Sequence, residues 1–110
     1  MLRISVLNEL AGIRLKLEGK LAHEWVREAE TAWTAVVGLN GNSEIVVDLF
    51  GVSFVDEPGH GLLAAMRHAG AELVGDGPLM SALIDEIEQA ESVAERNLKR
   101  EATFTKSKRS

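Results

Sequence analysis

A chain of 110 residues provides material for one domain, because domains commonly hold roughly 100 to 200 residues. Hydrophobic residues make up 45% of the sequence and charged residues 26%, which is typical of a globular protein and excludes wholesale disorder. Cysteine is absent, which excludes disulfides and thiol catalysis, and no apolar run approaches the roughly 18 to 20 residues of a membrane span. We therefore expect one cytoplasmic domain without a signal segment.

The net charge of -5 is distributed unevenly along the chain. Residues 1–88 hold 6 Lys or Arg against 14 Asp or Glu, whereas residues 89–110 hold 6 against 3. An acidic body disfavours nucleic acid as a partner, because phosphate binding depends on Lys and Arg. We predict a domain over residues 1–88, followed over residues 89–110 by a helical extension and a basic, flexible tail.

Two strands open the predicted fold. Apolar residues alternate with polar ones over residues 2–6 and again over residues 13–17, on either side of a turn at residues 8–12. The second strand has a polar face, which is unlike a strand between two helical layers. We therefore expect the helices mainly on one side of the sheet.

An amphipathic helix is predicted next, because from Leu21 the apolar residues recur at spacings of three and four. Gly38 and the turn-forming residues 40–42 end it. Trp25 and Trp33 are eight residues apart and therefore lie nearly on one face. We expect both to be packed or half-buried rather than stacked on a ligand.

The middle of the predicted sheet is the apolar run 45–47. It does not alternate with polar residues, so we expect a strand buried on both faces, with a loop over residues 51–55 after it. Pro58 then lies where a helix accepts proline best, in the first turn, with Asp56 or Glu57 capping or flanking the helix start.

Two short elements complete the fold. Gly70 ends the second helix, residues 71–74 form a fourth strand, and a third helix buries four apolar side chains, namely Leu79, Leu83, Ile84 and Ile87. The order strand, strand, helix, strand, helix, strand, helix predicts an α/β fold with a four-stranded, mostly parallel sheet. Right-handed crossovers produce the parallel pairs, and the opening hairpin adds an antiparallel edge.

A resemblance to a known family is most specific from Val47 to Gly59, which reads VDLFGVSFVDEPG, and at Leu62 and Leu63. With the hairpin and helix before it, this segment resembles the STAS domain, the family of sulfate transporter and anti-sigma factor antagonist domains. The resemblance covers residues 2–88. It implies a small module in the regulation of transcription that binds proteins, in the best-known cases an anti-sigma factor with a kinase-type ATP-binding fold. It implies no catalysis and no cofactor.

The phosphorylation switch of that family is altered in this sequence. Regulated members read Asp, Ser, Ser, Gly at the start of the second helix, and a kinase partner phosphorylates the second serine. The corresponding residues here are Asp56, Glu57, Pro58 and Gly59. Pro58 has no hydroxyl, so the usual switch cannot operate at this position. Glu57 matches the residue before the acceptor and carries about half the charge of a phosphate, so we do not interpret it as a phosphate mimic.

The predicted partner-binding surface is the loop before the second helix and part of that helix: Phe54, Asp56, Glu57, Pro58, Gly59, His60 and Arg67. The resemblance implies that partners dock there. We expect Asp56 and Glu57 to offer negative charge to a partner's Arg or Lys, and Pro58 to offer a rigid apolar contact.

Other kinds of site are not favoured by the sequence. Asp56 and Glu57 would repel a nucleotide phosphate at the helix start, and Asp56, Glu57 and His60 have no second cluster to complete a metal site. Nothing resembles a hydrolytic triad. Two alternatives stay open, an accessory STAS subunit of a lipid-transporting ABC complex and a sensor of a small ligand or nucleotide. Self-association is also open, because the sheet has edge strands and the long third helix could mediate a dimer.

Overall fold

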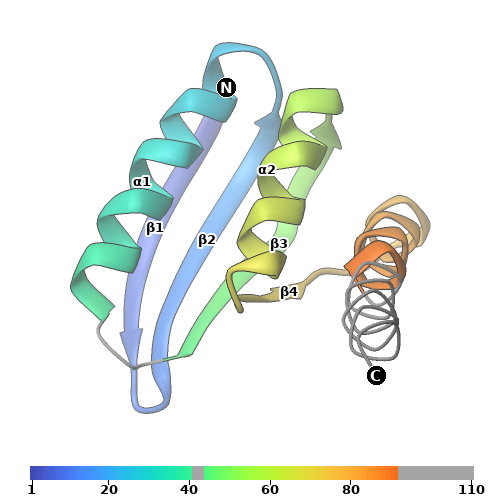
Figure 1. Ribbon diagram of the computed structural model, residues 1–110. Coiled ribbons are helices and arrows are strands. Elements are labelled where there is room, and N and C mark those ends of the chain that lie inside the picture. Colours follow the sequence, from blue (N-terminus) through green and yellow to red (C-terminus); the bar gives the residue numbers. More distant parts are fainter. Residues whose placement is uncertain (41–43, 92–110) are drawn as a thin grey trace, which may run out of the picture.

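Four strands form one mixed sheet in the order β1-β2-β3-β4 in the computed structural model, which describes residues 1–40 and 44–91 (Figure 1). The strands are β1 (Leu2–Glu9), β2 (Gly12–Leu21), β3 (Glu44–Val55) and β4 (Glu72–Val74). β1 and β2 pair antiparallel, and the two other neighbouring pairs are parallel. The predicted α/β class, element order and mixed sheet are confirmed.

Three helices follow the strands in the predicted order. α1 (Glu24–Asn40) connects β2 to β3, α2 (Glu57–His68) connects β3 to β4, and a C-terminal helix covers residues 78–91. Both crossovers run in the same direction across the sheet, so α1 and α2 lie on one face of it (Figure 1). The predicted turn residues 41–42 and tail residues 92–110 lie outside the described part of the chain.

The core lies between the sheet and these helices. In β2, Leu15 and Leu17 are fully buried while Arg14 and Lys16 lie on the opposite face, as the alternation predicts. The helices and β3 add the other large side chains that are fully buried: Val47, Leu49, Leu63 and Met66, with Leu21 at the end of β2. This burial removes apolar surface from water and supplies most of the driving force for folding.

β3 differs from the sequence prediction, because residues 51–55 belong to the strand and not to a loop. The register between β2 and β3 shifts twice, between Lys16 and Glu18 and between Gly19 and Lys20, and each shift leaves one extra residue in β3. Such bulges break the two-residue period by which a strand is recognised. Burial on both faces is found only at the centre of β3, where Val47 and Asp48 point to opposite faces and are both buried, whereas Ile45 and Val46 are half-buried. The described helices cover the face of Val47, and Arg14 shields Asp48 on the other.

Three of the four apolar residues predicted to be buried by the C-terminal helix pack against the core: Ile87 is buried, and Leu83 and Ile84 are half-buried. Leu79, however, is 58% exposed, and Met80 is buried in its place. Met80, Ile84 and Ile87 are spaced by four and three residues and therefore form one stripe, from which Leu79 is turned away. Met80 packs against the turn at Gly75, where a Cβ atom would lie 2.7 Å from the Met80 Cγ.

Candidate protein-binding surface

Two turns meet where β2 and β3 end. Leu21 and Val55 are the last paired residues of these parallel strands, so the chain leaves both strands at the same edge of the sheet. One turn leads from β2 into α1 and the other from β3 into α2. The backbone N–H of Asp56 donates to the carbonyl oxygen of Leu21 at 3.2 Å, which joins the second turn to the first.

The carboxylate of Asp56 accepts hydrogen bonds from both turns of this junction. Its Oδ1 accepts from the backbone N–H of Gly59 at 2.8 Å, which makes Asp56 the N-cap of α2, as predicted. Its Oδ2 accepts from the backbone N–H of His23 at 2.8 Å. The bond from His23 and then the bond from Gly59 hold the pKa of Asp56 below its ordinary value, because both favour the ionised form. The structure thus gives this charge an internal role.

His23 holds an unusual backbone conformation at the same junction. Its φ of 55° is in the left-handed region, which residues other than glycine seldom adopt. The turn is stabilised by the bond from the His23 N–H to Asp56, 33 residues along the chain. A sequence reading of either turn alone does not find this contact, because nothing local to His23 points to residue 56.

Gly59 is buried at the start of α2 and has no room for a side chain. A Cβ atom there would lie 2.4 Å from the carbonyl oxygen of Leu21 and 3.0 Å from Cγ1 of Val55. The first turn of α2 is therefore in direct contact with the end of β2. Of the predicted surface residues, half-buried Asp56 and buried Gly59 thus build the junction.

Three of the predicted residues are exposed beside this junction, namely Phe54, Glu57 and Pro58, and we call them the α2-start surface. Phe54 is 45% exposed on β3, opposite Lys20 of β2. Glu57 and Pro58 lie in the first turn of α2, where the proline ring fixes the backbone. The surface combines an aromatic ring, a rigid apolar ring and one carboxylate on a tightly bonded backbone.

His60 and Arg67 turn to a different side of α2 and face the C-terminal helix. The His60 Nε2 lies 3.8 Å from a carboxylate oxygen of Glu86, and the Arg67 Nε lies 3.8 Å from one of Glu88. At the end of α2, the His68 Nδ1 lies 3.1 Å from a carboxylate oxygen of Glu91. Arg67 is therefore separated from the α2-start surface, although the sequence placed them together.

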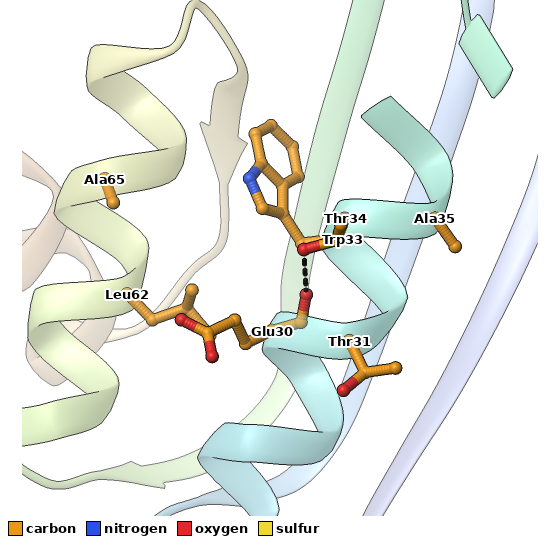
Figure 2. A pocket seen from close by; sticks show the side chains of 7 residues that line it. All are labelled: Glu30, Thr31, Trp33, Thr34, Ala35, Leu62 and Ala65. Carbon is orange, nitrogen blue, oxygen red and sulfur yellow. Dashed lines mark hydrogen bonds between the residues drawn. The ribbon is translucent and has the colours of Figure 1, made fainter. Parts of the chain in front are cut away.

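A hollow of about 530 Å³ between α1 and α2 was not predicted (Figure 2). Its lining comes from both helices: Glu30, Thr31, Trp33, Thr34, Ala35, Leu62 and Ala65. The half-buried indole of Trp33 projects from α1 into the space beside α2 (Figure 2). Pro58, Leu62 and Ala65 are spaced by four and three residues, so one face of α2 leads from the α2-start surface into the hollow.

The sequence did contain a partial signal for this hollow. The spacing of Trp25 and Trp33 predicted their shared, half-buried face correctly, and both are half-buried. The spacing cannot predict the distance between α1 and α2, because that distance depends on where each helix packs on the sheet. The hollow therefore becomes visible only in the assembled fold.

Two further observations concern the residues that the structure describes. Within residues 1–40 and 44–91, no group of three or more His, Asp or Glu side chains is placed to hold a metal ion. In the same ranges, no helix has both the length and the apolar character needed to cross a membrane.

No protein-family model matches the sequence, and no curated protein matches it.

Proposed function

We propose that this chain is a cytoplasmic, non-catalytic module of the STAS type that binds a protein partner, in the manner of an anti-sigma factor antagonist. The α2-start surface is the observation that carries the proposal. Phe54, Glu57 and Pro58 are exposed together, and the backbone beneath them is held by the two hydrogen bonds of Asp56. A surface that is already ordered loses little conformational entropy when a partner binds.

The chemistry of the surface indicates what a partner should provide. Glu57 is exposed, and in the described residues it forms neither a salt bridge nor a side-chain hydrogen bond, so it is available to an Arg or Lys. Phe54 and Pro58 offer apolar contacts, and the neighbouring hollow can accept an apolar side chain beside Trp33. A kinase-type anti-sigma factor with a basic and apolar docking face is the partner that we propose.

Regulation in this proposal does not involve residue 58. The family's acceptor serine corresponds to Pro58, which lies in the first turn of α2 and has no hydroxyl to phosphorylate. Binding is therefore constitutive, or it is controlled by the amount of the protein. Binding that is not switched by phosphorylation would also suit an accessory subunit of an ABC transporter. The experiment must therefore distinguish this alternative from an anti-sigma factor antagonist.

The experiment is affinity capture from the native cell extract with a charge reversal at Glu57, because reversal at Asp56 would also break the junction. Glu57→Arg is compared with the wild type and with Glu72→Arg, which makes the same charge change. Glu72 is exposed on β4 and pairs with Val46, near the opposite end of β3. Captured proteins are identified by mass spectrometry, and circular dichroism verifies that each variant is folded.

The proposal expects a kinase-like protein that is captured by the wild type and by Glu72→Arg and is lost with Glu57→Arg. Capture that is equal for all three proteins would contradict the role of the α2-start surface. An ABC ATPase captured in fixed stoichiometry would instead establish the accessory-subunit function.

A second candidate function, sensing of a small ligand, is favoured by the hollow alone. Its volume of about 530 Å³ lies within the range of about 300 to 1,000 Å³ that is typical of small-molecule sites. Thermal unfolding with a metabolite library tests it, since a ligand at 100 times its Kd stabilises a protein by about 2.7 kcal/mol. A hit that also changes the fluorescence of Trp33 in a Trp25→Phe background would place the ligand in the hollow.

A further inference from the structure

The outer edge of β1 is formed by unpaired backbone groups that can be identified one by one. The Lys20 N–H donates to the carbonyl oxygen of Met1 at 3.2 Å, and Leu2 lies opposite Gly19. In an antiparallel ladder this makes the odd-numbered residues of β1 the ones that bond to β2. The even-numbered residues therefore point their N–H and C=O groups away from the sheet: Leu2, Ile4, Val6 and Asn8.

Nothing in the described part of the chain protects this edge. β1 pairs with β2 over eight consecutive residues without a register shift, and its sequence contains neither proline nor lysine. Bulges, prolines, lysines and covering segments are the devices by which natural edges avoid pairing with other strands. α1 packs against one face of the sheet, in front of β1 and β2 in Figure 1. The opposite edge of the sheet, β4, has only three residues.

Exposed apolar side chains gather around the same edge. Val6 is 50% exposed and Leu7 43% exposed, and Leu10 at the tip of the hairpin is fully exposed. In the last turns of α1, Val37 and Leu39 are exposed as well. Val6 and Leu7 are consecutive in β1 and point to opposite faces of the sheet, so exposed apolar side chains lie beside this edge on both faces.

The charges of β1 are complementary to a second copy of β1 in one register. If two β1 strands pair antiparallel about a two-fold axis at Val6, Arg3 of each copy lies opposite Glu9 of the other. Arg3 and Glu9 are both odd-numbered and therefore lie on the same face of the extended sheet. Glu9 uses its Oε2 for Arg14 at 3.1 Å, which leaves Oε1 for the incoming Arg3. Leu2 and Leu10 also become partners in this register.

Other symmetric registers lose this complementarity. A shift of the axis by one residue, to Ser5, places Arg3 opposite Leu7, so that neither Arg3 nor Glu9 lies opposite a charge of the other copy. The register centred on Val6 also brings the outward N–H and C=O groups of the even-numbered residues opposite one another, as an antiparallel ladder requires. An axis at Ser5 would satisfy the same hydrogen bonds, so it is the pairing of Arg3 with Glu9 that selects the register centred on Val6.

We propose that two copies of the chain pair through their β1 edges, antiparallel and centred on Val6, to form one continuous sheet across both copies. The interface is isologous, because the same strand contributes from each copy. It lies on β1, whereas the α2-start surface lies on the far side of β2, so a dimer can bind two partners at once.

The first test is the dimerisation constant of the full 110-residue chain, measured by sedimentation equilibrium. Val6→Pro removes an outward N–H and places a ring against the second copy, while the bonds from β1 to β2 are kept. We expect a concentration-dependent dimer for the wild type and a folded monomer for Val6→Pro. A wild type that stays monomeric, or a dimerisation constant that Val6→Pro does not change, would overturn the proposal.

The second test examines the register and does not depend on proline. Arg3→Glu places two carboxylates opposite each other across the interface, and Glu9→Arg places two guanidinium groups there, so each variant alone repels itself. We expect each dimer to weaken by roughly tenfold or more. An equimolar mixture of the two variants restores both attractive pairs and should dimerise as the wild type does. Failure of the mixture to recover would exclude the register centred on Val6.

Discussion

The junction of β3 with α2 and the outer edge of β1 differ in how their backbone groups are paired. At the junction, the N–H groups of His23, Asp56 and Gly59 each donate to a partner inside the chain. Along β1, every second N–H and C=O group points away from the sheet. A surface of the first kind can recognise a partner only by side chains, whereas one of the second kind accepts any strand of suitable register. The first suits a specific foreign partner and the second suits a second copy.

The largest change in stability that we predict is at Gly59, which packs against the end of β2 at the junction. Gly59→Ala should lower the free energy of unfolding by about 2 to 3 kcal/mol, because its Cβ would meet the carbonyl oxygen of Leu21. Gly61→Ala, two residues along α2, has open space around its Cβ and should raise the same free energy by about 0.5 to 1 kcal/mol. Urea unfolding of both variants at pH 7 measures the difference. Similar losses for the two would show that helix propensity, and not the contact with β2, governs the site.

The second prediction compares Asp48 and Glu9, the two acidic partners of Arg14 on the sheet face that carries no described helix. Asp48 is nearly buried, accepts from Phe50 N–H and lies 3.0 Å from Arg14 Nη1. Asp48→Ala should lower the free energy of unfolding by about 1 to 3 kcal/mol, because it leaves these donors without their acceptor. Glu9→Ala removes the exposed partner of Arg14 and should have a smaller effect. Thermal unfolding of both variants gives the order, and the reverse order would refute this assignment.

The third prediction concerns acid and is specific to the junction. The pKa of Asp56 in the folded protein lies below its ordinary value of 3.8, so its stabilising contribution is complete above that value. The contribution is lost as the pH falls from about 3.8 through the lowered pKa. Asp56→Asn lacks the titrating group, so the stability difference between wild type and variant should be large at pH 7 and shrink toward pH 2. Unfolding in urea across this range measures it, and a pH-independent difference would contradict the shift.

The smallest effect on stability is expected at the hairpin tip. Leu10 is fully exposed, so Leu10→Ser should change the free energy of unfolding by less than about 0.5 kcal/mol. The same change removes an apolar contact from the proposed β1 interface and should weaken the dimer. Unfolding at low protein concentration and sedimentation at high concentration separate the two quantities. A substantial loss of stability in the monomer would show that Leu10 supports the fold itself.

Sequence reasoning succeeded where a local pattern controls the structure. Leu15 and Leu17 alternate with charged residues, and Pro58 follows an aspartate cap, so the second strand and the start of the second helix were predictable. It failed where contacts between distant segments decide. The bulges of β3 depend on pairing with β2, and the second hydrogen bond of Asp56 joins residues 33 positions apart.

The same limit explains the mixed outcome for the candidate site. Helical spacing could place Arg67 on α2 but could not show that the C-terminal helix packs beside it, with Glu88 3.8 Å away. The family resemblance and the function that it implies stay a prediction.

The double hydrogen bond of Asp56 also has a consequence for folding. It spans the β2–α1 turn and the β3–α2 turn, so neither turn can reach its final form before β2 and β3 have paired. The α2-start surface therefore reaches its final form only once β2 and β3 have paired, and a chain without that pairing would not display it to a partner. In native-state hydrogen exchange, the amides of His23 and Gly59 should open together, as members of one cooperative unit.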